Sequence, residues 1–364
     1  MDKINKSGAE ALIHSLHLEG VDLMFGYPGG AALHIYDAIF NQNYVDHILV
    51  RHEQGAVHAA DGYARATGKP GVALVTSGPG ATNAITGLAT AYMDSTPIVV
   101  ISGQVKSNLI GTDSFQETDM IGVSRPIVKH SFLVQRAEDI PDIVKKAFHI
   151  ATTGRKGPVV IDIPKDFTDP EYKFEFNYPT EVNMRSYNPP EGADTSRIKE
   201  AADMIASAKR PVIYSGGGVN QNNASEELTA LAKLLNFPVT NTLMGLGAFP
   251  GSDPQFMGML GMHGTYQANM AMHNADLIIA VGARFDDRIT NDPKQFALSA
   301  KKIHIDVDPA SVSKIIHADI PIVGSAKESL TSLIEELKSR DLKTNESDIS
   351  EWNKQIKNWR DAHG

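Results

Sequence analysis

The chain has 364 residues, enough for two domains that each bury their own core. Apolar residues make up 42% and charged residues 21%, which is typical of globular proteins and excludes a disordered chain. The formal charge of −9, without any stripe of clustered Lys and Arg, argues against nucleic-acid binding. The sequence contains no cysteine, which excludes disulfides, thiolate nucleophiles and cysteine-ligated zinc.

We expect neither a signal peptide nor a membrane span in this sequence. The first residues lack the apolar core of a signal peptide, and no later stretch reaches the roughly 18 uncharged apolar residues that a span requires. We therefore expect a cytoplasmic protein that has no membrane partner.

Short apolar runs alternate with helical patterns along the chain. The runs are too short and too uniformly apolar for half-exposed strands, so they predict buried parallel strands. They occupy residues 72–76, 97–102, 158–163, 211–214, 275–281 and 302–307. Helical spacing occurs between them, as at 54–66, 140–152, 196–208 and 225–235. This order predicts an α/β protein with two doubly wound parallel-sheet domains.

The regular pattern lapses near residues 167–194, where four prolines lie among polar and aromatic residues. This composition is typical of a domain linker. We expect a first domain at 1–168, a linker at 169–194 and a second domain at 195–340. The polar and charged residues 341–364 are expected to be a C-terminal tail, helical or not.

Glu53 is the first candidate catalytic residue. It follows an apolar strand pattern and precedes an Ala-rich helix, so it lies at the sheet edge where α/β proteins bind ligands. A glutamate that only favours a helix N-terminus would have the same placement.

Two glycine-rich turns accompany it, at residues 27–31 and 76–83. Glycine lets the backbone approach a ligand, and the helix after residue 78 offers free N–H groups. Ordinary tight turns would explain both segments equally well.

Together these motifs resemble those of the acetolactate (acetohydroxyacid) synthase large subunit, a thiamine-diphosphate enzyme. The resemblance is carried by residues 25–31, 51–54, 77–83, 111–117 and 157–166, in matching order and spacing, and it continues into the second domain. It implies a pyrimidine-binding first domain and a central flavin-binding, Rossmann-like second domain.

The resemblance assigns roles to several residues of the first domain. Glu53 would bond N1′ of the cofactor's aminopyrimidine and share a proton with that ring, and Gln116 would lie near the reacting groups. Phe115 and Lys165 are similar to residues of the substrate channel. Cofactor contacts are also implied for Gly29, Pro79 and Asn83.

FAD is expected in the second domain from the resemblance alone, because residues 214–219 do not form a G-x-G-x-x-G fingerprint. Arg284 would face the diphosphate, while Asp306 and Asp319 would bond hydroxyl groups or the adenine. The matching positions are Arg155, Gly216, Gly217, Gly218, Thr242, Leu243, His263, Gly264, Thr265, Gly282, Arg284, Asp286, Arg288, Asp306, Asp308, Asp319 and Ile320.

Two features depart from the family pattern. Lys106 occupies a position where proline is usual, so the channel wall could differ in shape and charge. The Gly-Asp-Gly segment that holds Mg²⁺ and the diphosphate in a third domain does not occur in this chain. We therefore expect no metal site here, a missing third domain, and no activity from this chain alone.

The favoured function is the decarboxylating condensation of pyruvate with pyruvate or 2-oxobutanoate, on the route to valine, leucine and isoleucine. A homodimer or homotetramer and a regulatory small subunit are the expected partners. A related enzyme such as pyruvate oxidase, or a non-catalytic module for FAD binding or oligomerisation, remains an alternative. Glyoxylate carboligase is disfavoured because it lacks the catalytic glutamate.

Overall fold

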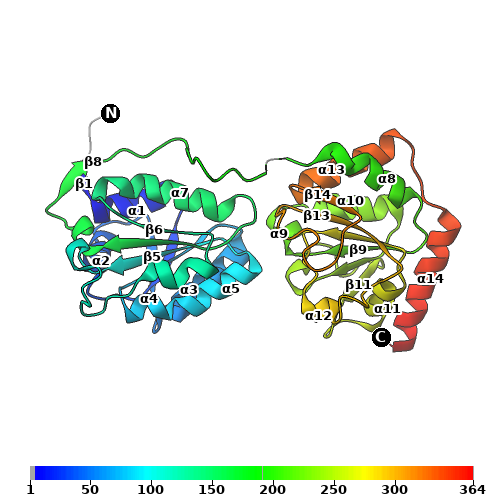
Figure 1. The fold of residues 1–364 in the computed structure, drawn as a ribbon, viewed down its shortest axis with the longest axis horizontal. Helices are drawn as coiled ribbons and strands as arrows, with labels where there is room; N and C mark the ends of the chain where they lie inside the picture. Colours follow the sequence, from blue (N-terminus) through cyan, green and yellow to red (C-terminus); the bar gives the residue numbers. More distant parts are fainter. Residues whose placement is uncertain (1–4, 191, 364) are drawn as a thin grey trace. The chain divides into compact units, whose positions relative to one another are not determined.

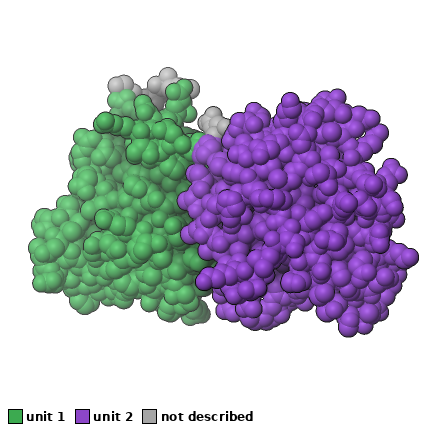
Figure 2. Space-filling view, turned by 45° about the vertical axis from the view of Figure 1, so that its right-hand side comes forward, with its two compact units in different colours: residues 1–189 green, residues 190–364 purple. Residues whose placement is uncertain are grey.

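The computed structural model describes residues 5–190 and 192–363. Residues 1–4, 191 and 364, which the domain predictions include, lie outside this part. The chain forms two compact units that meet between Pro189 and Pro190 in the sequence (Figures 1 and 2). Each unit is described by itself.

The first unit alternates strands with helices. Its strands are β1 (Asn5–Ser7), β2 (Leu23–Gly26), β3 (Asp46–Leu49), β4 (Gly71–Val75), β5 (Ile98–Gln104), β6 (His130–Leu133), β7 (Val159–Pro164) and β8 (Lys173–Glu175). Its helices are α1 (Gly8–Leu18), α2 (Leu33–Phe40), α3 (Glu53–Thr67), α4 (Pro79–Asn83), α5 (Ile85–Asp94), α6 (Met120–Ser124) and α7 (Ile140–Thr152).

Six strands of the described part of this unit form a parallel sheet in the order β3-β2-β4-β5-β7-β6. Successive residues of β4 face opposite sides. Val72 and Leu74 pack in the core with α1 and α7, whereas Ala73 and Val75 pack in the core with α3 and α5. Because both faces are covered, the central strands β4, β5 and β7 are buried along their whole length, as the sequence predicts.

The segment expected to be a linker begins as part of the first unit. β8 pairs with β1 in an antiparallel ladder, with Phe174 opposite Lys6. Further on, Tyr187 receives a 2.8 Å hydrogen bond from Lys129 Nζ. Aromatic residues therefore hold much of this proline-rich segment against the unit.

The second unit repeats the alternation. Its strands are β9 (Pro211–Ser215), β10 (Val239–Asn241), β11 (Phe256–Met259), β12 (Leu277–Val281), β13 (Lys301–Asp306) and β14 (Ile320–Val323). Its helices are α8 (Ile198–Ala206), α9 (Gly217–Gln221), α10 (Ser225–Leu235), α11 (Tyr266–Asn274), α12 (Asp287–Thr290), α13 (Ala326–Ser339) and α14 (Glu346–His363).

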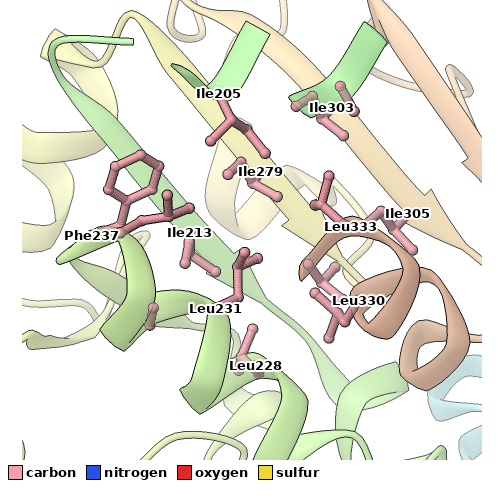
Figure 3. Close-up of a cluster of buried hydrophobic side chains, with 14 of the residues drawn as sticks. Ile205, Ile213, Leu228, Leu231, Phe237, Ile279, Ile303, Ile305, Leu330 and Leu333 are labelled. Carbon is pink, nitrogen blue, oxygen red and sulfur yellow. The ribbon is translucent and has the colours of Figure 1, made fainter. Parts of the chain in front are cut away.

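These strands form a parallel sheet in the order β11-β10-β9-β12-β13-β14. On one face, Ile213, Ile279 and Ile303 pack against leucines of α10 and α13 (Figure 3). On the other face, Val212 and Ile278 pack in the core that includes α11 and α14. The predicted fold class, two doubly wound parallel-sheet domains, is confirmed.

The C-terminal residues form a helix rather than an irregular tail. Trp352 and Ile356 of α14 are buried in the second unit, and Trp352 Nε1 donates a 3.0 Å hydrogen bond to the Pro211 carbonyl. The apolar content of this segment is low, because only a narrow stripe of the helix is buried. The helical spacing of its apolar residues could have predicted this buried stripe.

Candidate active site

The two glycine turns of the first unit meet where the order of its strands reverses. From β2 the chain passes to β3 on one side of β2, and then to β4 on the other side of β2. The switch point therefore lies between β2 and β4. Ligands of doubly wound sheets bind at this place. Thr76, directly after β4, accepts a 3.2 Å hydrogen bond from the Ala31 N–H. A Cβ atom on Gly29 would lie only 2.3 Å from Thr76 Cγ2, so the contact requires glycine.

Glu53 lies beside this point as the first residue of α3. Glu53 is 8% exposed, and its Oε2 accepts a 2.9 Å hydrogen bond from Asn83 Nδ2. A Cβ atom on Gly80 would lie 3.3 Å from Glu53 Oε1. Oε1 accepts no hydrogen bond from any residue that the structure describes. The fold therefore joins two motifs 30 residues apart around one partly paired carboxylate.

Tyr36 and His47 also lie in this region, and the sequence reasoning missed both. The Tyr36 hydroxyl is 3.3 Å from His47 Nε2. Burial and, second, the Glu53 carboxylate raise the pKa of Tyr36 above its ordinary value. No prediction reached His47, because strand β3 is short and mixed in polarity.

The loop 111–119 carries Phe115 and Gln116 to the Gly78 turn. Gln116 has a φ of 57°, and a Cβ atom on Gly78 would lie 2.5 Å from its carbonyl oxygen. Phe115 is 87% exposed. Lys165 begins a short 3₁₀ helix after β7, and Lys106 is exposed. The structure thus brings the Gln116 backbone to the Gly78 turn, but shows no hydrogen bond between the Gln116 and Glu53 side chains.

A buried carboxyl group supports the same loop. Gln104 Nε2 donates to Asp162 Oδ2 at 3.0 Å and to the Thr118 carbonyl at 2.8 Å. Asp162 is 1% exposed, and its Oδ1 has no hydrogen-bond partner in the described part of the chain. Burial, assisted by the charge of Asp119, raises the pKa of Asp162 to about 7. The sequence reasoning placed Asp162 in a strand but gave it no role.

The second unit has a matching switch point between β9 and β12. The Gly216 N–H donates to the Val281 carbonyl at 2.9 Å, and the Gly218 N–H donates to the Gly282 carbonyl at 3.0 Å. Gly282 has a φ of 55°, and a Cβ atom on Gly218 would lie 2.7 Å from its Cα. Glycine at these positions lets the two backbone turns come into contact. This contact explains the spacing of the glycines, although they do not form a G-x-G-x-x-G fingerprint.

Most of the other residues matched to the flavin site lie along the same edge, after the carboxyl ends of the parallel strands. Thr242 follows β10 and donates its N–H to the Ser215 carbonyl at 2.9 Å. Thr265 follows β11 and caps α11. The remaining members at or after a carboxyl end are Gly217, Leu243, His263, Gly264, Arg284, Asp286, Arg288, Asp306 and Asp308.

Two residues of the expected flavin site lie at the opposite edge of this sheet. Asp319 and Ile320 lie at the amino end of β14, and Asp319 forms a 3.0 Å ion pair with Lys301. The strand pattern did not reveal this, because β14 itself was not predicted. Arg155 belongs to the first unit, where its Nε donates a 2.8 Å hydrogen bond to Ser95 Oγ.

Residues 5–190 and 192–363 contain no group of three or more His, Asp or Glu that could hold a metal ion. None of the helices described there is both long and apolar enough to cross a membrane.

Family models match both units. Residues 6–123 match the N-terminal TPP binding domain of thiamine pyrophosphate enzymes, and residues 198–333 match their central domain. Each match contains one of the switch points described above. The chain belongs to the thiamine pyrophosphate enzyme family.

Its relatives in this family are acetolactate synthase large subunits. The chain is 57% identical to that of Haemophilus influenzae over 354 residues, which are 97% of this chain and 62% of the relative. It is 56% identical to the isozyme 3 large subunit of Escherichia coli, with the same coverage. A probable large subunit of Methanocaldococcus jannaschii is 52% identical over 93% of this chain and 58% of the relative. The resemblance predicted from the motifs is confirmed, and the chain spans about three fifths of the length of these relatives.

Proposed function

We propose that this chain supplies the pyrimidine-binding and flavin-binding parts of an acetolactate synthase catalytic subunit. The observation that carries the proposal is the buried Glu53 carboxylate. Asn83 binds one of its oxygens, and the other has no hydrogen-bond partner among the described residues. Its place at the switch point of a thiamine pyrophosphate enzyme domain supports the assignment.

The residues present fit thiamine diphosphate. When bound, the cofactor supplies an electron sink for the decarboxylation of a 2-oxo acid. Glu53 Oε1 would hold a proton shared with N1′ of the aminopyrimidine, and Asn83 would fix the orientation of the carboxylate. The low exposure of Glu53 keeps water from competing for that proton. Gly29 and Pro79 would offer backbone to the ring, and Gln116 would lie near the substrate.

The second unit fits a flavin nucleotide. The contact between Gly218 and Gly282 leaves backbone without side chains at the switch point, where a diphosphate can approach. Arg284 and Arg288 would supply positive charge to the diphosphate. Asp306 and Asp308 would accept hydrogen bonds from hydroxyl groups of the nucleotide. Because the condensation has no net redox step, we propose a structural role for FAD.

The substrates that we propose are two molecules of pyruvate, or pyruvate with 2-oxobutanoate, in the synthesis of branched-chain amino acids. Mg²⁺ would be bound by a segment that corresponds to the part of the relatives outside the match with this chain. We further propose a homodimer or homotetramer with a regulatory small subunit. The relatives, described as large subunits, support such a partner.

The test is acetolactate formation by a chimera, because the relatives are longer than this chain. The chain would be joined to the segment of the Escherichia coli relative that it does not span, and supplied with thiamine diphosphate, Mg²⁺, FAD and pyruvate. Acetolactate is expected without oxygen consumption. Oxygen-dependent decarboxylation would instead indicate an oxidase, and FAD binding without turnover would indicate a non-catalytic module.

A further inference from the structure

The turn after β12 is held in place by hydrogen bonds that its carbonyl groups accept from the rest of the unit. Gly216 and Gly218 donate their N–H groups to the carbonyls of residues 281 and 282. The next two carbonyls are bound by buried side chains: His304 Nε2 lies 3.0 Å from the Ala283 oxygen, and the Tyr214 hydroxyl lies 3.2 Å from the Arg284 oxygen. Four successive carbonyls therefore have donors from the protein.

The amide groups of this turn have the opposite pattern. The N–H groups of residues 283–286 donate to no acceptor among the residues that the structure describes. Ala283 and Phe285 are nevertheless 1% and 4% exposed. Buried N–H groups without acceptors are costly, and successive free amides are the groups that bind anions in proteins.

Tyr214 and His304 reach the turn from one row of the sheet. Both pair with Ala280 of β12, Tyr214 from β9 and His304 from β13. The small Ala280 between them leaves space for two rings, and the Phe285 ring packs against both at centroid distances of 5.6 and 5.3 Å. Tyr214 is fully buried and His304 is 1% exposed, so neither side chain is available to a ligand.

The polar atoms of the Tyr214 and His304 side chains form hydrogen bonds with carbonyls of the turn. A carbonyl can only accept, so His304 must carry its proton on Nε2, and its Nδ1 then has no partner in the described chain. Burial lowers the pKa of His304, which favours the neutral ring. An apolar pair would fill the same space at lower cost, so the two hydrogen bonds call for an explanation beyond packing.

We propose that Tyr214 and His304 are positioning residues that hold the 282–286 turn with the amides of residues 283–286 presented to the diphosphate of a bound flavin nucleotide. The proposal rests on the flavin part of the proposed function. Neither residue touches the ligand, and both act through the carbonyls of residues 283 and 284.

The test compares Tyr214→Phe, His304→Leu and His304→Gln in the full chain. Phenylalanine keeps the ring and removes the hydroxyl, leucine removes the donor, and glutamine retains an N–H donor. Tyr63→Phe, which deletes a hydroxyl hydrogen bond to Asp22 in the first unit, is the control. Affinities for FAD, ADP and riboflavin would be measured by calorimetry and flavin fluorescence.

The expected result is a loss of roughly three- to tenfold in affinity for FAD and ADP in Tyr214→Phe and His304→Leu, the size that a lost buried hydrogen bond produces. Riboflavin, which lacks the diphosphate, should bind equally to all variants, and His304→Gln should recover most of the loss. Unchanged FAD and ADP affinities, or equal losses for riboflavin, would overturn the proposal.

Hydrogen exchange of the nucleotide-free chain separates this proposal from the flavin assignment. Gly216 and Gly218 donate to the turn, so their amides should exchange faster in Tyr214→Phe and His304→Leu than in the control. If the unmodified chain binds neither FAD nor ADP, the flavin assignment fails, and faster exchange would still support the positioning role. Unchanged exchange would contradict it.

Discussion

Asp162 shows what one buried carboxyl group does to stability. Its pKa is raised to about 7 from 3.8, so the folded chain binds this proton more tightly than the unfolded chain does. The stabilising contribution is complete below pH 3.8 and is lost as the pH rises through 7. A shift of about three units corresponds to on the order of 4 kcal/mol. We expect unfolding by urea to become easier between pH 4 and about 7, and then to level off with respect to this group.

The control for Asp162 is Asp162→Asn, which keeps an oxygen for Gln104 but cannot titrate. The difference in free energy of unfolding between the two proteins should move in favour of the asparagine variant as the pH rises. Parallel pH profiles would show that Asp162 does not titrate as its burial requires.

The residue scale also shows the limits of sequence reasoning. Glu53 and Asn83 were found because each lies in a motif at the end of a predicted strand. Asp162 and its partner Gln104 are 58 residues apart, and their hydrogen bond depends on the pairing of β5 with β7. Tyr36 and His47 depend in the same way on tertiary packing. Local patterns contain no signal for such pairs.

At the scale of elements, the turn at Gly78 connects the switch point to the Gln116 loop. Gly78 has a φ of 56°, and a Cβ atom would lie 2.5 Å from the Gln116 oxygen. We expect Gly78→Ala to destabilise the first unit by about 1 to 3 kcal/mol, through backbone strain and displacement of the loop. Urea denaturation measures the change.

Gly62 provides the comparison for Gly78. It is an exposed residue within α3, and a Cβ atom there would have no neighbour within 4 Å. Gly62→Ala should stabilise the unit by up to about 1 kcal/mol, because alanine favours helix. Equal effects of the two substitutions would mean that contact with the Gln116 loop is not what constrains Gly78.

Helix α14 should contribute substantially to the second unit. Trp352 is 4% exposed and donates a hydrogen bond to Pro211. Trp352→Ala should lower the free energy of unfolding by about 3 to 5 kcal/mol, and Trp352→Phe by less, because its ring still fills the space. If truncation to alanine cost less than about 1 kcal/mol, α14 would be a loosely attached segment.

The elements themselves were largely predictable. The six predicted strands coincide with β4, β5, β7, β9, β12 and β13, most of whose residues are buried. The strands that were missed are short or at sheet edges, as with β14, which has four residues, lies at the end of its sheet and is only partly buried.

At the scale of the whole molecule, each unit has its own parallel sheet and its own cores. We therefore expect residues 1–189 and 190–364 to fold as separate fragments. Each should unfold cooperatively in urea with native-like circular dichroism. The second can also be followed by fluorescence, because both tryptophans, Trp352 and Trp359, lie in α14. A fragment that is unfolded alone but folded in the full chain would show that the units depend on each other.

The central claim is that Glu53 shares a proton with the aminopyrimidine of thiamine diphosphate. Its most direct test is the rate at which the C2 proton of the bound cofactor exchanges with deuterium, followed by NMR in the chimera and in its Glu53→Gln variant. We predict exchange at least about 100-fold slower in the variant, with the fold and FAD binding retained. Equal exchange rates in two folded proteins that both bind the cofactor would contradict the claim.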